Sequence, residues 1–139
     1  MTTIAEAYAA IQTSVKHIMS PSQLSTFGDN VRGEESEFFK SKLVELANTF
    51  NTMPKTYEQD GKGDDAIAYL HYFRGGWDWY ITEKDMEPEQ LQAFGLVFGH
   101  ECELGYVSIV ELQSVGAELD LHFTPTTLRE IKAAKAAAY

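Results

Sequence analysis

Apolar residues recur every three or four positions through the first fifty residues, which is the spacing of helices with one buried face. The first stripe predicts a helix to about Met19, opened by a capping box of Thr3 and Glu6. A short helix is expected after Pro21, and a longer one over 34–52 that Pro54 ends. The predicted buried stripes are Ile4, Tyr8, Ile11, Val15 and Ile18 in the first helix and Phe39, Leu43, Leu46 and Phe50 in the third.

After Asp65 the pattern changes to alternation with a period of two, which is typical of strands. Two aromatic strands over 66–73 and 77–82 surround the turn Arg74-Gly75-Gly76 and predict a hairpin. Three more strands are expected over 93–99, 104–107 and 118–123, with a short helix between Ser108 and Gly116. Gly95 and Gly99 indicate a bulge or a close backbone approach in the third strand.

These elements predict an α+β fold in which N-terminal helices pack on a mainly antiparallel sheet of about five strands, followed by a C-terminal helix. A length of 139 residues favours a single domain, 1–139. We divide it into a helical part (1–54), a sheet part (64–123) and a C-terminal helix (125–138).

Alternation within the hairpin places Trp77, Trp79 and Ile81 on one face of the sheet, and Asp78, Tyr80 and Thr82 on the other. We interpret the tryptophan face as core, because large aromatics at alternating positions mostly serve burial. The alternative is a stacking platform for nucleobases or an aromatic recognition surface, but the basic residues that such platforms use are not interleaved here.

Charge is distributed unevenly along the chain. Of 21 acidic and 11 basic side chains, residues 58–120 hold 14 acids against Lys62, Arg74 and Lys84. A net charge of −10 disfavours direct nucleic-acid binding, which needs clustered Lys and Arg, and a protein partner with a basic surface fits better. One cysteine, Cys102, no signal-like start and no apolar run of about 20 residues predict a cytoplasmic protein that does not bind membranes.

The acidic run formed by Glu83, Asp85, Glu87 and Glu89 has two interpretations. It is either a solvated face or a charged surface that binds a protein, with exposed aromatics such as Tyr57, Tyr72 or Tyr80 as anchors. Glu83, Asp85, Glu87, Glu89 and Tyr80 are the candidate protein-binding residues.

Candidate metal ligands gather at a strand end, where His100, Glu101 and Glu103 lie within four positions and His71 could approach from a neighbouring strand. Residues adjacent in sequence rarely converge on one ion, and a solvated acidic turn explains them as well. No nucleophile elbow or phosphate-binding loop is present, so we assign no catalytic residue and expect no cofactor.

Four blocks of the sequence resemble the domain-of-unknown-function family numbered 2958: residues 27–39, 53–85, 93–112 and 118–131. The runs WDWYITEKD and ELGYVSIVEL are the most specific parts. Membership would imply a bacterial protein carried on phages, plasmids or other mobile elements. The family supplies no reaction, cofactor or site residue.

The sequence therefore predicts a small acidic protein, more in keeping with a binding protein than an enzyme, that binds a host or element protein. By analogy with acidic proteins of mobile elements, that partner could be a nucleic-acid-binding defence factor, which the protein would inhibit. Two alternatives stay open: a metal-dependent enzyme centred on His100, Glu101 and Glu103, and an accessory subunit that forms a homodimer through an open sheet edge.

Overall fold

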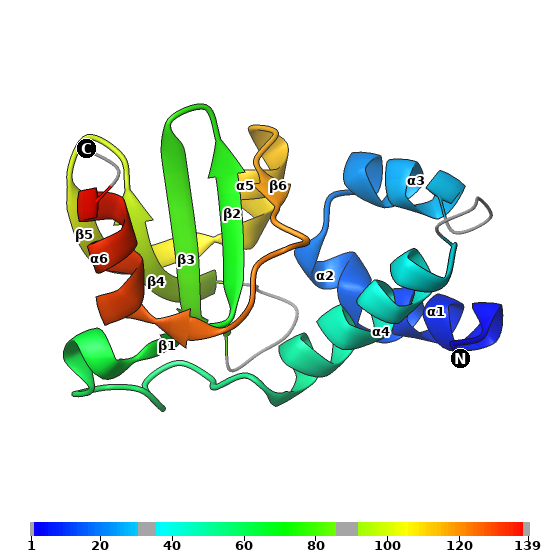
Figure 1. Cartoon of the computed structure of the whole chain (residues 1–139), viewed down its shortest axis with the longest axis horizontal. Helices are drawn as coiled ribbons and strands as arrows, with labels where there is room; N and C mark the ends of the chain where they lie inside the picture. Colours follow the sequence, from blue (N-terminus) through cyan, green and yellow to red (C-terminus); the bar gives the residue numbers. More distant parts are fainter. Residues whose placement is uncertain (1, 31–35, 86–91, 138–139) are drawn as a thin grey trace. The chain divides into compact units, whose positions relative to one another are not determined.

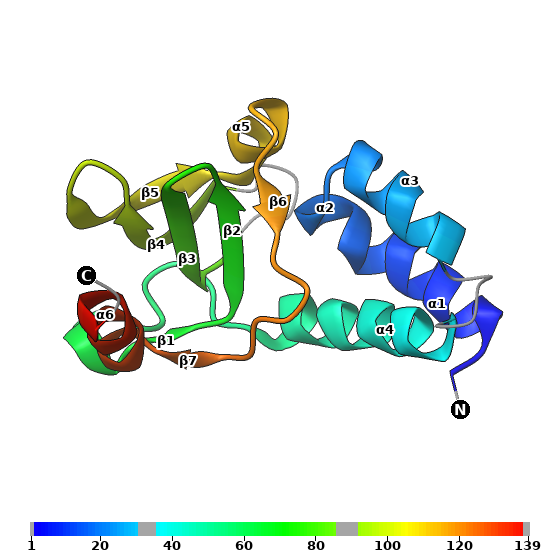
Figure 2. The same ribbon diagram turned by 45° about the horizontal axis from the view of Figure 1, so that its top comes forward.

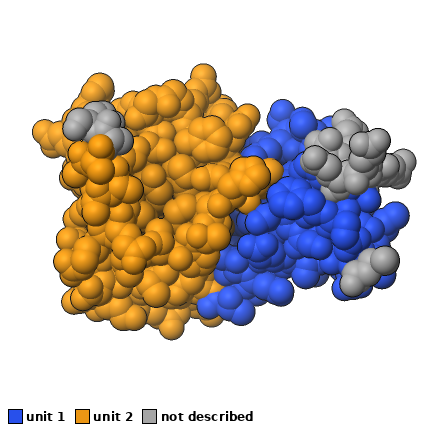
Figure 3. Space-filling view, viewed as in Figure 1, with its two compact units in different colours: residues 1–52 blue, residues 53–139 orange. Residues whose placement is uncertain are grey.

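The computed structural model describes residues 2–30, 36–85 and 92–137 (Figure 1). The chain divides into a helical unit of residues 1–52 and a sheet unit of residues 53–139 (Figure 3). The α+β class, the antiparallel sheet and the C-terminal helix are confirmed. That the two units act as a single domain stays a prediction.

The helical unit begins with a helix whose middle turn is wider than an α-helical turn. It consists of α1 (Ile4–Ala10), a π-helical turn (Ile11–Val15), α2 (Lys16–Ile18), α3 (Pro21–Asn30) and α4 (Ser36–Thr52). The Thr3 capping box is confirmed, because the Glu6 N–H donates to Thr3 Oγ1 at 3.0 Å and the Thr3 N–H to Glu6 Oε1 at 3.2 Å.

The π-helical turn changes which face of the first helix is buried. The prediction was wrong for Ile4 and Tyr8, which are 65% and 63% exposed. A π turn contains an extra residue, so the positions predicted before it, Ile4 and Tyr8, do not share a face with Val15 and Ile18 at its end and beyond it. The buried positions are Ala7, Ala10, Ser14, Val15 and Ile18. In α4 the predicted stripe is confirmed at Leu43, Leu46 and Phe50.

The sheet unit contains a five-stranded antiparallel sheet in the order β5-β4-β3-β2-β6 (Figure 2). Its strands are β2 (Leu70–Arg74), β3 (Trp77–Glu83), β4 (Gln92–Phe98), β5 (Cys102–Ser108) and β6 (Glu118–Leu119). A separate pair joins β1 (Ile67–Ala68) to β7 (Thr126–Thr127), and the helices are a 3-10 turn (Gly63–Asp65), α5 (Ile109–Ser114) and α6 (Leu128–Ala137). Because residues 126–127 pair with β1, the last helix begins at Leu128 rather than at Pro125.

One face of the sheet packs against α6 to form a core. Its buried members are Ala66, Ala68, Tyr80, Leu96, Leu128 and Ile131. The tryptophans lie on the opposite face, and the interpretation of Trp77 as core was wrong, because it is 39% exposed. Trp77 lies next to the hairpin turn, where its ring packs against Gly99 and contacts the His100 ring edge-on at 5.3 Å. None of the helices in the described part of the chain has the length and apolar character needed to cross a membrane.

A β-bulge interrupts the alternation of β3 near its end. Ile81 pairs with Gly95 and Glu83 with Phe94, so Thr82 is an extra residue on β3. Without the bulge, Glu83 would share the face of Trp77 and Ile81; the extra residue brings it to the face of Phe94 instead. Gly95 is required opposite this point, since a Cβ there would lie 2.0 Å from the Tyr80 carbonyl oxygen.

Candidate functional site

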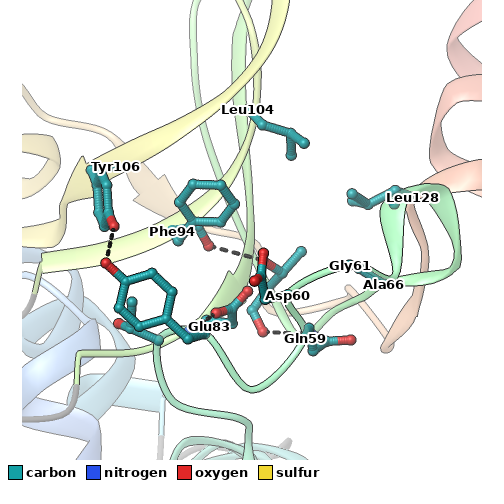
Figure 4. A pocket seen from close by; sticks show the side chains of 13 residues that line it. Gln59, Asp60, Gly61, Ala66, Glu83, Phe94, Leu104, Tyr106 and Leu128 are labelled. Carbon is teal, nitrogen blue, oxygen red and sulfur yellow. Dashed lines mark hydrogen bonds between the residues drawn. The ribbon is translucent and has the colours of Figure 1, made fainter.

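A cavity of about 190 Å³ lies beside the bulge, between the sheet and the loop that precedes β1 (Figure 4). Its apolar lining includes Phe94, Leu104 and Leu128, and its polar lining includes Gln59, Asp60 and Glu83. The Tyr57 and Tyr106 side chains also line it and remain exposed, at 67% and 55%. The cavity therefore combines apolar walls with carboxylates, and we call it the Glu83 pocket.

Backbone pairing at the end of β3 positions the loop over the Glu83 pocket. The Lys84 N–H donates to the Pro54 carbonyl, and the Thr56 N–H donates to the Lys84 carbonyl, each at 2.9 Å. Tyr57 then adopts a left-handed conformation, with φ of 76°, and its N–H donates to the Glu83 carboxylate. A non-glycine residue in this region of φ is uncommon and is held there by its surroundings.

Gln59 holds the loop, β1 and the bulge together. Its side chain is 4% exposed, and its Nε2 donates to the carbonyls of Ile67 and Thr82 at 2.8 Å each. Its Oε1 accepts the Ile67 N–H at 2.7 Å. Because the buried amide is satisfied on both sides, it fixes the shape of the pocket rather than offering a group to a ligand.

Glu83 lies in a poorly compensated electrostatic environment. The residue is 5% exposed, and burial raises the pKa of its carboxyl. Backbone hydrogen bonds from Tyr57 and Gln59 oppose this shift, and the charges of Asp60 and Glu58 add to it. No ion pair involves Glu83 within residues 2–30, 36–85 and 92–137. Its carboxylate is therefore held by backbone donors without a cationic partner from the described chain.

The two tyrosines of the Glu83 pocket are joined through their hydroxyl groups, which lie 3.0 Å apart. This hydrogen bond raises the pKa of Tyr106. The Tyr106 ring meets the Phe94 ring edge-on at 5.4 Å (Figure 4). An aromatic group therefore borders the space that contains the carboxylates.

A second polar cluster surrounds His71, towards the other end of β3. The imidazole Nε2 lies 2.7 Å from Asp78 Oδ1, and Nδ1 lies 2.8 Å from Asp120 Oδ2. Asp78 also pairs with Lys135 of α6, and the Tyr80 ring stacks on the imidazole at 4.3 Å. An ionised carboxylate can only accept a hydrogen bond. Each ring nitrogen of His71 can therefore bond to its carboxylate only by donating a proton-bearing N–H.

Cationic partners determine the electrostatics of this second cluster. Although burial opposes ionisation, the hydrogen bonds from Lys135 and His71 lower the pKa of Asp78. Burial raises the pKa of Tyr80 to about 12, and the charges of Asp78 and Asp120 act in the same direction. The cluster is satisfied by its own partners, which is typical of a structural network.

The candidate protein-binding residues are not a uniform solvated face. Glu83 is buried in the pocket, and Asp85 is half-buried and accepts the Gln92 N–H at 3.2 Å. Glu87 and Glu89 lie outside the described residues. Tyr80 was wrong as an exposed anchor, because it is 8% exposed and packs in the core, and Tyr72 is buried as well. Of the suggested aromatic anchors, Tyr57 is exposed.

The candidate metal ligands are not brought together. His100, Glu101 and Glu103 are exposed around the turn between β4 and β5, whereas both nitrogens of His71 face Asp78 and Asp120. Within the described ranges, no three His, Cys, Asp or Glu side chains are arranged to hold a metal ion. The description of these residues as an exposed acidic turn fits the structure.

Sequence reasoning missed most of the Glu83 pocket. Gln59, Phe94 and Tyr106 were not singled out, because they come from a loop and two strands and share no spacing along the chain. One signal was available: Gly95 predicted a bulge or close packing, and the bulge is what turns Glu83 towards the pocket.

No protein-family model matches the chain, and no curated protein or solved structure is significantly similar to it. The resemblance to family 2958 therefore stays a prediction.

Proposed function

We propose that the chain is a non-enzymatic binding protein that recognises a basic surface on a host or element protein. The resemblance to a family of mobile elements supports a more specific version, in which the partner is a nucleic-acid-binding defence factor that the protein inhibits. The single observation that carries the proposal is the buried carboxylate of Glu83 in an accessible pocket, without a cation from the described chain.

The distribution of charge between the units supports this proposal. Residues 53–139 contain 15 acidic and 7 basic side chains, a net charge of −8, while residues 1–52 carry a net charge of −2. A field of this sign accelerates encounters with basic partners and suppresses binding to acidic ones. The excess lies on the unit that contains the Glu83 pocket.

Ion pairs with α6 restrict where the acidic excess is available. Arg129 pairs with Asp65 at 2.9 Å, Lys132 pairs with Asp64 at 2.7 Å, and Lys135 pairs with Asp78. The hydrogen bond from Lys132 lowers the pKa of Asp64. Acidic charge near α6 is thus offset internally, whereas Glu58, Asp60 and Glu83 enter no ion pair in the described part of the chain.

The experiment compares two variants of equal net charge as baits for host-lysate proteins at low salt. One carries Glu58→Gln and Asp60→Asn beside the pocket, and the matched control carries Glu111→Gln and Glu118→Gln elsewhere on the unit. We expect the control and the native protein to retain the same basic protein and the pocket variant to lose it. Binding of that protein should weaken as salt rises, because exposed charges are screened over about 10 Å at 0.1 M.

Two results would overturn the proposal. Retention of the same proteins by all three baits would show that the acidic loop is only solvated. Binding that is insensitive to salt would exclude recognition of a basic surface.

A specific observation keeps one alternative in view, the homodimer through an open sheet edge. β5 ends the strand order, and its Leu104 and Tyr106 side chains are 49% and 55% exposed. An uncovered edge strand is a template for pairing with a second copy. Light scattering at several concentrations separates this arrangement from a monomer.

A further inference from the structure

We propose that the Glu83 pocket receives the side chain of a lysine or arginine presented by the protein partner. The inference rests on the proposed function, and it adds the place and the chemistry of the central contact.

The size of the pocket selects a side chain over a larger ligand. Pockets for drug-sized molecules and cofactors usually measure about 300–1,000 Å³, and this cavity measures about 190 Å³. One long side chain of a protein therefore matches the space.

The charge of the pocket selects a cation. Glu83 is 5% exposed, its carboxylate accepts the Tyr57 N–H, and Asp60 lines the same space. A buried carboxylate without a cationic partner is costly to ionise, and a cation placed beside it would offset that cost. An anionic group would instead meet two carboxylates, so acidic peptides and phosphates are excluded by repulsion.

The walls of the pocket fit the remaining parts of a cationic side chain. Lysine and arginine carry apolar stems that pack on apolar surface while the charged end stays polar. Phe94, Leu104 and Leu128 provide such a surface. The Tyr57 and Tyr106 rings, joined at their hydroxyls, add aromatic groups to which cations are attracted.

The chain's own contacts fix the structure around the Glu83 carboxylate. The bulge at Thr82 directs Glu83 to the pocket face, Gln59 bonds to the Thr82 carbonyl at 2.8 Å, and Tyr57 is held at φ of 76°. Pre-organisation of this kind reduces the ordering cost of binding. It supports a binding site rather than an accidental gap in packing.

The test is a titration of the full chain, labelled with ¹⁵N, with single-residue probes observed by NMR. The cationic probes are the N-acetyl methylamides of lysine and arginine, and their neutral counterparts are those of norleucine and citrulline. We expect shifts at the amides of Tyr57, Glu83 and Tyr106 with the cationic probes, with a dissociation constant on the order of 1–10 mM. The lysine and arginine arms identify which cation the pocket prefers.

The matched variants are Glu83→Gln and Glu118→Gln, which remove one charge each. In Glu83→Gln the new side-chain amide keeps an oxygen that can accept the Tyr57 N–H, so the loop should retain its structure. Binding of the cationic probes should nevertheless weaken at least tenfold. Glu118→Gln, at an exposed position of β6, should leave binding unchanged. If Glu83→Gln does not fold, Asp60→Asn on the exposed loop replaces it, with a two- to fivefold loss expected.

Equal shifts from norleucine and lysine, or no shift at the three amides from any probe, would overturn the inference. If the pocket fails but the lysate experiment still yields a salt-sensitive basic partner lost with Glu58 and Asp60, the proposed function stands. If the cationic probes bind but no basic protein is retained, the pocket is a cation site and the proposed protein partner is wrong.

Discussion

Asp78 and Glu83 lie near opposite ends of β3, and the pKa values of their carboxyl groups are shifted in opposite directions. Asp78 is hydrogen-bonded to His71 and Lys135, and its pKa is lowered. Glu83 is held by backbone groups of the loop, and its pKa is raised. The two residues are five positions apart on one strand. The difference comes from what the fold brings to each end, because α6 supplies a cation to Asp78 and the loop before β1 supplies more acids to Glu83.

This comparison separates a carboxylate used for stability from one available for binding. A charge-assisted network that is satisfied internally contributes to folding and has little to offer a ligand. A buried charge without a partner costs stability and is more often part of a functional site. The acidic composition of residues 58–120 does not distinguish these two cases.

The largest effect is expected from a substitution that disturbs the bulge directing Glu83 towards the pocket. In Gly95→Ala the new Cβ would meet the Tyr80 carbonyl oxygen at 2.0 Å, so β3 or β4 must shift. We expect a loss of about 3 kcal/mol, the upper part of the range for overpacking. Urea unfolding followed by tryptophan fluorescence measures it, because both tryptophans lie in the sheet unit.

Gly105→Ala is the matched control for this substitution. Gly105 pairs with Gly95 across β4 and β5, and a Cβ there would have nothing within 4 Å. Its free energy of unfolding should stay within about 0.5 kcal/mol of the native value. Similar losses for the two variants would contradict a tight approach at Gly95.

The next largest effect is expected from Asp78→Asn, at the end of β3 where the carboxylate has cationic partners. The substitution removes the charge that faces His71 and Lys135, and we expect a loss of about 1.5–3 kcal/mol at pH 7. The control is Asp65→Asn, whose ion pair with Arg129 is exposed and should contribute much less, because solvent screens it. Urea unfolding of both variants at pH 7 provides the measurement.

The pH dependence of the Asp78 effect has a defined sign. Because the pKa of Asp78 is lowered in the folded state, its stabilisation is complete above its ordinary value of 3.8. It is lost as pH falls through the lowered value, so the difference between the native protein and Asp78→Asn should shrink there. A difference that stays constant down to that pH would mean that packing, not charge, causes the loss.

The smallest expected change in the free energy of unfolding is a gain rather than a loss. Glu83→Gln removes the uncompensated charge and keeps an acceptor for Tyr57, so we expect a gain of less than about 1 kcal/mol at pH 7. The raised pKa of Glu83 means that the native protein gains stability as pH falls through that value towards 4.5. The difference in free energy of unfolding between the native protein and Glu83→Gln should therefore decrease over this pH interval. If the variant is less stable than the native protein at pH 7, the Glu83 charge is not a cost to the fold.

Local patterns predicted the class of the fold and much of its order. The Thr3 capping box, the buried stripe from Leu43 to Phe50 and the hairpin around Gly75 depend on neighbours a few residues apart, so the sequence displays them. One-residue irregularities were harder to predict: Gly95 indicated a bulge or a close approach, but nothing in the sequence placed the extra residue at Thr82 or the π-helical turn. The π-helical turn at 11–15 and the bulge at Thr82 each shift a face by one position and leave the average period unchanged.

The sites depend on contacts that are distant in sequence. Lys132 and Asp64 are 68 positions apart and Lys135 and Asp78 are 57 apart, so the offset of acidic charge by α6 could not be read from composition. The same is true of the Tyr57–Tyr106 contact, which spans 49 positions. A regional charge count therefore identified the acidic segment but not which of its members are available.

The pairing of β7 and α6 with earlier parts of the chain also affects how the protein folds during its synthesis. Residues 126–127 complete the pair with β1, and Leu128 and Ile131 complete the core around Tyr80. The strands through β6 leave the ribosome before these partners do. The nascent sheet unit therefore keeps an open apolar face until residues 126–137 have emerged as well.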